Sequence, residues 1–181
     1  MAGMNLSNLE KQMNDLFGVK APKMPEGGKK FFMTYFPVLT LIAAVLSVLG
    51  AWGVWSAARS VGGYVNLANE LSRTYGTGET ISTSNLTLWV WFAAAFMVAN
   101  AVLYFLAYNP LKAHVKKGWD LLFYASLLHV AYSIVTLFIQ GRGFGSFVLG
   151  LLFSALGFWI LFQVRPGYTK GGAHPSSTDS K

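Results

Sequence analysis

The stretch that decides the fold is FFMTYFPVLTLIAAVLSVLGAWGVWSAA, at residues 31–58. It contains no Asp, Glu, Lys or Arg. A helix needs about 20 apolar residues to cross the roughly 30 Å hydrocarbon layer of a bilayer. The stretch is therefore long enough to form a membrane span. It is also far longer than the apolar part of a cleaved signal peptide, so we expect it to stay in the protein as an anchor.

Three further apolar runs follow, at residues 86–108, 119–140 and 144–164. In the whole chain 54% of the residues are hydrophobic and only 12% are charged, whereas soluble domains carry about 25% charged residues. The sequence therefore predicts an all-α integral membrane protein, a four-helix bundle with a membrane domain at 31–164. Since only residues 141–143 separate the last two runs, we expect these two spans to form an antiparallel hairpin.

The distribution of Lys and Arg predicts the orientation of the spans. Eleven lie before the first run, between the second and third runs, or after the fourth, and three lie in the other two connections. Because cytoplasmic segments carry an excess of Lys and Arg, we expect both termini in the cytoplasm. The net charge of +7 then follows from topology, and we expect no nucleic acid partner.

Residues 1–30 form the cytoplasmic segment before the first span, and we expect a short amphipathic helix followed by a linker. Ser7 and Glu10 have the spacing of a capping box, and Gly18 is suited to end the helix. Apolar residues share one face of this helix, namely Leu6, Leu9, Met13, Leu16 and Phe17. The helix either lies on the inner membrane surface or the bundle, or it binds a partner.

The connection at 59–85 carries a second amphipathic pattern. Six residues recur at helical spacing, namely Val61, Tyr64, Val65, Ala68, Leu71 and Tyr75. We expect an external amphipathic helix that either continues the first span past Gly62 and Gly63 or bends onto the outer surface. At the other end of the chain, residues 165–181 are rich in Gly, Ser and Pro, which predicts a disordered cytoplasmic tail.

Two prolines lie near the cytoplasmic ends of the second and fourth spans. These are Pro110 and Pro166, each close to basic residues. Since proline lacks the amide hydrogen that continues a helix, we expect each helix to end there.

The third span carries a polar stripe. Five polar residues are spaced three and four apart, namely Ser126, His129, Ser133, Thr136 and Gln140. Such a stripe should face the bundle interior, and Asn100 on the second span, one turn from Tyr104, lies at a depth similar to that of His129. The group forms either hydrogen bonds that hold helices together or an intramembrane site for a small molecule, and an Asn100–His129 hydrogen bond requires the two spans to be neighbours.

Small residues and lysines predict contacts with helices and lipid. Small residues four apart let helix backbones approach closely, as at Ala43, Ser47 and Ala51, and at Ser146, Gly150 and Ser154, with Gly157 near the same face. These surfaces serve packing within the chain or self-association. Five lysines are placed to contact anionic lipid headgroups, namely Lys29, Lys30, Lys112, Lys116 and Lys117.

Composition argues against several classes of function. There are no cysteines, which excludes disulfides and thiolate metal sites. Among the three histidines only His129 lies in a span, so a bis-histidine haem site is not expected within one chain. No acidic residue lies in the middle of a span, where coupled transporters usually place one. We expect no catalytic residues, metal or cofactor.

Three passages resemble uncharacterised small four-span membrane proteins of reduced-genome bacteria. They are residues 71–76, LSRTYG, the basic connection at 109–119, and residues 158–168. The resemblance covers most of residues 5–170 and implies a bacterial inner membrane, with no catalytic residues.

Two hypotheses of function follow. The first is a non-enzymatic membrane protein that serves as a structural, assembly or interaction subunit, alone as a homo-oligomer or with a protein partner. The second is a small-molecule binder or transporter with a polar intramembrane site around His129 and Asn100.

Overall fold

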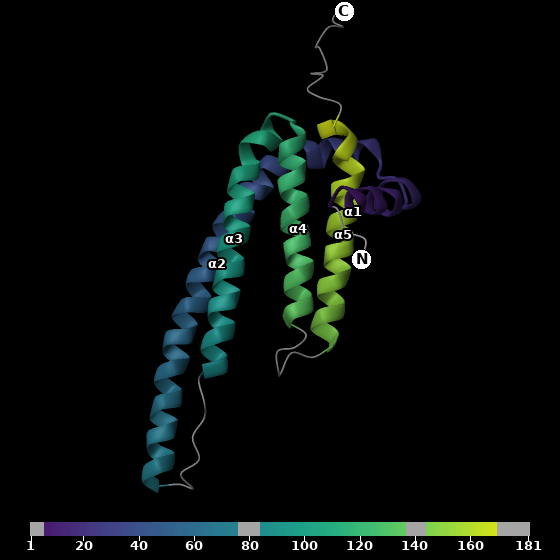
Figure 1. Cartoon of the computed structure of the whole chain (residues 1–181). Coiled ribbons are helices and arrows are strands. Elements are labelled where there is room, and N and C mark those ends of the chain that lie inside the picture. The colour runs from purple at the N-terminus through teal and green to yellow at the C-terminus, as the bar shows by residue number, and fades with distance from the viewer. Residues whose placement is uncertain (1–5, 76–83, 137–143, 170–181) are drawn as a thin grey trace, which may run out of the picture. The chain divides into compact units, whose positions relative to one another are not determined.

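In the computed structural model of the protein, residues 6–75, 84–136 and 144–169 are described, and helices make up nearly all of these residues (Figure 1). A short helix comes first and is followed by four long ones. The elements in order are α1 (Leu6–Met13), the π-helical stretch η1 (Asn14–Lys20), α2 (Glu26–Tyr75), α3 (Ser84–Lys112), α4 (Lys116–Thr136) and α5 (Phe144–Thr169).

The four helices α2 to α5 are each long and apolar enough to cross a membrane. They contain the four apolar runs of the sequence. The prediction of an all-helical, multi-pass membrane protein with four apolar helices is therefore confirmed.

Helix α2 is much longer than a bilayer requires. Its 50 residues extend about 75 Å at the helical rise, against a hydrocarbon layer of roughly 30 Å. The helix runs through Gly62 and Gly63 without a break. Of the two expected arrangements of residues 59–75, the continuation of the first helix is thus the one observed.

Contacts divide the chain into two units, and each is described by itself. The first consists of Met1–Ile42 together with Leu103–Lys181, and the second is Ala43–Val102. The first unit therefore holds α1, η1, α4, α5, the start of α2 and the end of α3. The second holds the rest of α2 and α3.

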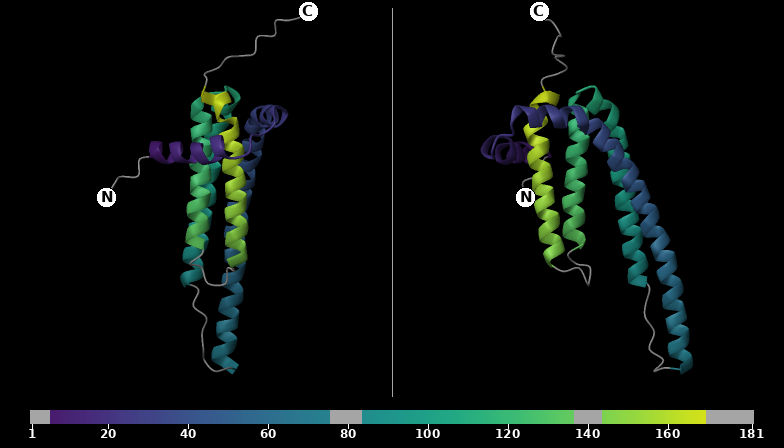
Figure 2. Two further views of the ribbon diagram at one scale, coloured as in Figure 1. Left: turned by 90° about the vertical axis from the view of Figure 1, so that its right-hand side faces the viewer. Right: turned by 180° about the vertical axis from the view of Figure 1, so that it is seen from behind.

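In the first unit, α4 and α5 pack side by side as the expected hairpin (Figures 1 and 2). The indole Nε1 of Trp119 on α4 donates a hydrogen bond of 2.7 Å to the carbonyl of Leu161 on α5. Further along, a Cβ on Gly150 would lie 3.5 Å from Oγ of Ser133, so the two backbones approach closely there. The two helices are thus in contact near both ends of the described part of the hairpin.

The beginning of α2 crosses the ends of α4 and α5 in the first unit (Figure 2). Phe32, Met33 and Phe36 pack against a buried cluster that includes Phe162, Val164 and Tyr168. Gly167 lies so close to the side chain of Met33 that a Cβ there would clash with it. These contacts bury the last turns of α5.

The expected helix ends at the two prolines are wrong. Pro110 lies inside α3, and Pro166 lies inside α5, which continues to Thr169. The residues 165–169 therefore belong to a helix and not to a disordered tail, while residues 170–181 lie outside the described residues. A proline this near a helix end removes one hydrogen bond, and the packing of α5 against α2 offsets that loss.

A tight turn joins α3 to α4. His114 has a positive φ of 52°, in the left-handed region that few non-glycine residues adopt. The amide of Val115 donates to the carbonyl of Pro110 at 2.9 Å, and the amide of Gly118 donates to Val115 at 3.0 Å. A Cβ on Gly118 would lie 2.6 Å from the backbone nitrogen of Leu111. The turn therefore requires glycine at this position.

In the second unit, α2 and α3 are in contact at Gly50, where a Cβ would lie 3.1 Å from Sδ of Met97. From that contact α2 continues to Tyr75, whereas α3 reaches back only to Ser84. The difference of about 12 residues means that α2 extends about 18 Å beyond the start of α3.

We expect Gly118→Ala to lower the free energy of unfolding by about 2 kcal/mol, because the new methyl group overlaps the backbone of Pro110 and Leu111. The free energy can be measured by denaturant titration in detergent micelles. Gly53→Ala is the matched control, since nothing lies within 4 Å of a Cβ there, and alanine favours a helix by up to about 1 kcal/mol. Equal losses in both variants would contradict the close approach at Gly118.

Candidate functional site

The N-terminal segment is docked on the end of α5. The ring of Phe17 stacks on Phe158, with centroids 6.0 Å apart, and on Phe162, with centroids 6.3 Å apart. Both α5 residues are buried. Phe17 and Met13 pack against the buried cluster that includes these two residues, whereas Leu6 and Leu16 of the expected apolar face are exposed.

Gln163 of α5 binds the main chain at two points, one in η1 and one in the linker at residues 21–25. Its Nε2 donates to the carbonyl of Phe17 at 2.9 Å, and its Oε1 accepts from the amide of Met24 at 3.2 Å. One turn earlier, Trp159 Nε1 donates to the carbonyl of Pro22 at 2.8 Å. Gln163 is only 5% exposed, so its amide is well protected from water. The linker therefore follows a defined path around α5.

Sequence reasoning did not single out Gln163 or Trp159. The available signal was a polar side chain and an indole four residues apart, in the last turns of an otherwise apolar helix. Which main-chain groups they bind depends on residues about 140 positions away. That information is not local in the sequence.

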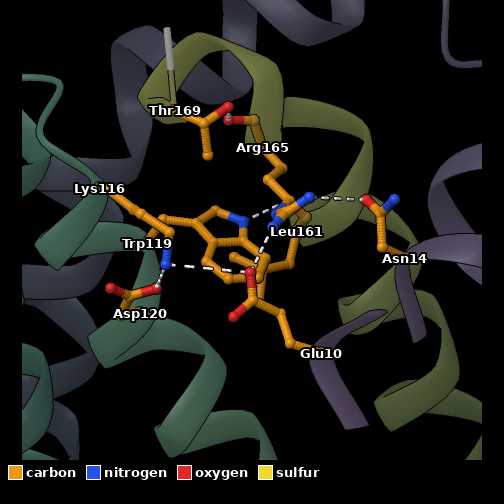
Figure 3. A network of polar contacts seen from close by, with 8 residues as sticks. All are labelled: Glu10, Asn14, Lys116, Trp119, Asp120, Leu161, Arg165 and Thr169. Atoms are coloured by element: carbon orange, nitrogen blue, oxygen red, sulfur yellow. Dashed lines mark hydrogen bonds and ion pairs between the residues drawn. The ribbon is translucent and has the colours of Figure 1, made fainter. Parts of the chain in front are cut away.

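A network of charged side chains surrounds Trp119, and Figure 3 shows its members. The guanidinium of Arg165 donates to the carboxylate of Glu10 and, at 3.2 Å, to Oδ1 of Asn14. Lys116 Nζ lies 2.6 Å from Asp120 and 3.9 Å from Glu10. The Arg165 guanidinium carbon lies 5.3 Å from the centre of a Trp119 ring. The network joins α1, η1, α4 and α5.

The expected caps of the N-terminal helix are wrong. Helix α1 already includes Leu6, so Ser7 lies inside it, and Glu10 pairs with Arg165 instead of completing a capping box. Gly18 lies inside η1, which ends at Lys20. A Cβ on Gly18 would lie 2.9 Å from Oδ1 of Asn14, so this glycine leaves room for the amide that Arg165 binds.

Three buried polar atoms near the end of α5 have no hydrogen-bond partner among the described residues. They are Nδ1 of His114, Nε of Arg165 and Oη of Tyr168. The rings of His114 and Tyr168 lie 5.6 Å apart at the α3–α4 turn. An unpaired buried polar group costs about 1–3 kcal/mol unless it finds a partner, such as an ordered water.

The polar stripe of α4 is only partly as expected. Ser126 donates to the carbonyl of Leu122 at 2.9 Å, and Ser133 to that of His129 at 2.9 Å. Nδ1 of His129 lies 3.0 Å from the carbonyl of Ala125. Ser126 and Ser133 are half-buried, but His129 is exposed, which contradicts a stripe that faces the interior throughout. The side chain of Thr136 and the whole of Gln140 lie outside the described residues.

Asn100 and Tyr104 of α3 fall in different units. Tyr104 belongs to the first unit, where its ring lies 6.5 Å from that of His129. Asn100 belongs to the second, is 1% exposed, and donates from Nδ2 to the carbonyl of Phe96 at 3.1 Å. Its Oδ1 has no partner among the described residues. The expected Asn100–His129 hydrogen bond joins residues of two units and stays a prediction.

Some of the small residues expected at helix contacts are half-buried, and one is exposed. Ala43, Ser47 and Ala51 are half-buried, and Ser47 donates to the carbonyl of Ala43 at 2.8 Å. On α5, Gly150 faces Ser133 and Ser154 is half-buried, whereas a Cβ on Gly157 would meet open space. Gly157 is therefore not part of this interface. The side chain of Ser146 lies outside the described residues.

Among the expected lipid-binding lysines, two already have carboxylate partners. Lys29 Nζ lies 2.7 Å from Glu26, and Lys116 pairs with Asp120. Lys30, Lys112 and Lys117 are exposed.

The end of α2 forms an exposed arm, defined as residues 59–75. Arg59 marks its beginning, where the guanidinium lies 3.7 Å from the centre of the Trp55 ring. One face of the arm carries Val61, Tyr64, Ala68, Leu71 and Tyr75, all of them exposed. Tyr64 and Tyr75 are 74% and 85% exposed. The spacing of three and four residues is that of a helix–helix contact stripe.

The described residues contain no group of three His, Asp or Glu side chains that could hold a metal ion.

We expect Glu10→Gln and Arg165→Gln each to lower the free energy of unfolding, with a coupling energy of about 1–2 kcal/mol in the double-mutant cycle, because this pair is largely buried. The exposed pair Asp15–Lys20 is the matched control, and its cycle with Asp15→Asn and Lys20→Gln should give less than about 0.5 kcal/mol. Unfolding in mixed micelles measures both cycles. Similar coupling in the two pairs would contradict a stabilising role for the network.

Comparison with known proteins finds no family model, no curated protein and no solved structure that matches this chain. What the protein does is therefore inferred from its own residues and contacts.

Proposed function

We propose that this protein is a non-enzymatic interaction or assembly subunit of the inner membrane, with both termini in the cytoplasm. The four apolar helices support membrane insertion, and the lysine distribution supports the orientation. The observation that carries the proposal is the exposed arm at 59–75, which extends beyond α3 and presents an apolar face.

The occupant of that face is a second copy of this chain. Copies inserted by the same topology point the same way through the bilayer, so their arms run parallel. In a parallel, in-register pair each edge of the contact faces the opposite edge of the other copy, and like charges on the two edges would repel. The edge positions are Val65, Leu67, Ser72 and Thr74, which are all uncharged.

The charged residues of the arm lie elsewhere on the helix. With Val61, Ala68 and Tyr75 at the first position of a seven-residue repeat, Glu70 and Arg73 fall at the third and sixth positions. Those positions point away from the partner helix in a two-stranded pair. The arm therefore combines an apolar contact face, neutral edges and a charged outer face.

Because the chain has no native cysteine, disulfide crosslinking in native membranes tests the parallel pair directly. We expect Tyr64→Cys and Leu71→Cys each to give a disulfide-linked dimer on mild oxidation, since these side chains meet their own copies within disulfide reach. Asn66→Cys and Arg73→Cys, on the outer face of the same arm, are the matched controls and should stay monomeric. Equal crosslinking on both faces, or none on either, would overturn the self-association.

A small-molecule binder is the alternative function, and one observation favours it. Asn100 is almost fully buried, and its Oδ1 has no partner among the described residues. An unpaired acceptor in an apolar setting is costly unless it serves a purpose. In this reading the acceptor binds a polar group of the ligand. Against it, His129 is exposed and contacts a carbonyl of its own helix.

We expect Asn100→Leu to leave the melting temperature in detergent unchanged or to raise it, because the substitution removes an unpaired buried oxygen at similar volume. Circular dichroism at increasing temperature measures this. Asn66→Leu, at an exposed position, is the control for added hydrophobicity. A clear fall in melting temperature for Asn100→Leu, but not for Asn66→Leu, would favour the polar site and the alternative function.

A further inference from the structure

The described part of the first unit carries more cations than its carboxylates can pair. Each of its four carboxylates has a cation within ion-pair distance: Glu10 with Arg165, Asp15 with Lys20, Glu26 with Lys29, and Asp120 with Lys116. Five lysines have no ion pair among the described residues. They are Lys11, Lys23, Lys30, Lys112 and Lys117, and all five are exposed.

The five lysines surround the end of α5. Lys11 follows Glu10, which pairs with Arg165, and Lys23 precedes Met24, whose amide binds Gln163. Lys112 and Lys117 flank the α3–α4 turn, where His114 lies against Tyr168 of α5. Lys30 lies one turn before the residues of α2 that cover α5. The uncompensated positive charge is therefore concentrated at one end of the unit.

The N-terminal segment adds an apolar edge to the same end. It lies across α5 and not along it (Figure 2). Phe17 faces α5, whereas Leu6, Leu16 and Val19 are exposed on the same segment that carries Lys11 and Lys20. Apolar side chains that stay exposed next to lysines are typical of a helix at the boundary between headgroups and acyl chains.

We propose that the five lysines form a binding surface for the anionic phospholipid headgroups of the leaflet that this end of the unit faces. The proposal rests on the membrane insertion argued above but not on the self-association. Lysine ammonium groups bind phosphate oxygens by charge-assisted hydrogen bonds, and the leaflet is the source of phosphate that also accommodates Leu6, Leu16 and Val19. The docked N-terminal segment carries Lys11 and Lys23, and the beginning of α2 carries Lys30.

Lipid selectivity of the full chain tests this surface. The protein is reconstituted in phosphatidylcholine bilayers with traces of spin-labelled phosphatidylglycerol or spin-labelled phosphatidylcholine, and the motionally restricted fraction of each label is measured. We expect phosphatidylglycerol to associate severalfold more strongly than phosphatidylcholine. The triple variant Lys11→Gln, Lys23→Gln, Lys30→Gln should lower that ratio towards one. The pair Lys112→Gln, Lys117→Gln should reduce it independently.

Arg73→Gln is the matched control, because it removes an exposed cation of the other unit, and it should leave the ratio unchanged. Raising the salt concentration should lower the ratio in the unmodified protein, whereas millimolar inorganic phosphate at constant ionic strength should not compete. A ratio near one in the unmodified protein, or a ratio that survives both lysine variants, would overturn the proposal. Loss of the restricted fraction for both labels would instead contradict membrane insertion itself.

Discussion

The burial of Trp119 between α4 and α5 is the interaction on which the first unit depends. Its indole donates to the carbonyl of Leu161, and its ring stacks on Phe123 at 5.4 Å. The guanidinium of Arg165 lies over the same ring and binds Glu10. One side chain thus joins the hairpin to the N-terminal segment. The apolar cluster around Trp119 excludes water, which strengthens the ion pairs beside it.

Around that cluster, polar and apolar contacts of the N-terminal segment support each other. Phe17 covers Phe158 and Phe162, and Gln163 binds the main chain at Phe17 and, within the linker, at Met24. The stacking protects the amide of Gln163 from water, and its hydrogen bonds in turn fix the position of the stacked ring. The segment is consequently part of the folded unit, although it precedes every apolar run. Leu6, Leu16 and Val19 of the same segment stay exposed.

The second unit presents a different surface. Its arm carries few polar groups on the face of Tyr64 and Leu71, and α2 extends well beyond the start of α3. The two proposed interactions therefore depend on different forces. Association of arms depends on apolar packing between helices, while lipid binding at the first unit depends on charge. Added salt should therefore weaken lipid binding but not the association of the arms, because screening weakens charge interactions and leaves apolar packing intact.

The sequence by itself determined the four apolar helices, because burial in hydrocarbon is decided by composition over about 20 consecutive residues. On the N-terminal segment it grouped five apolar residues on one face, of which Leu6 and Leu16 are exposed in the structure. It failed at the helix ends, since Pro110, Pro166, Ser7 and Gly18 take positions set by distant packing. Only the tertiary structure decided that Glu10 meets Arg165, which lies 155 residues away, and that His129 is exposed. Such contacts depend on which helix faces which, and no local pattern encodes that choice.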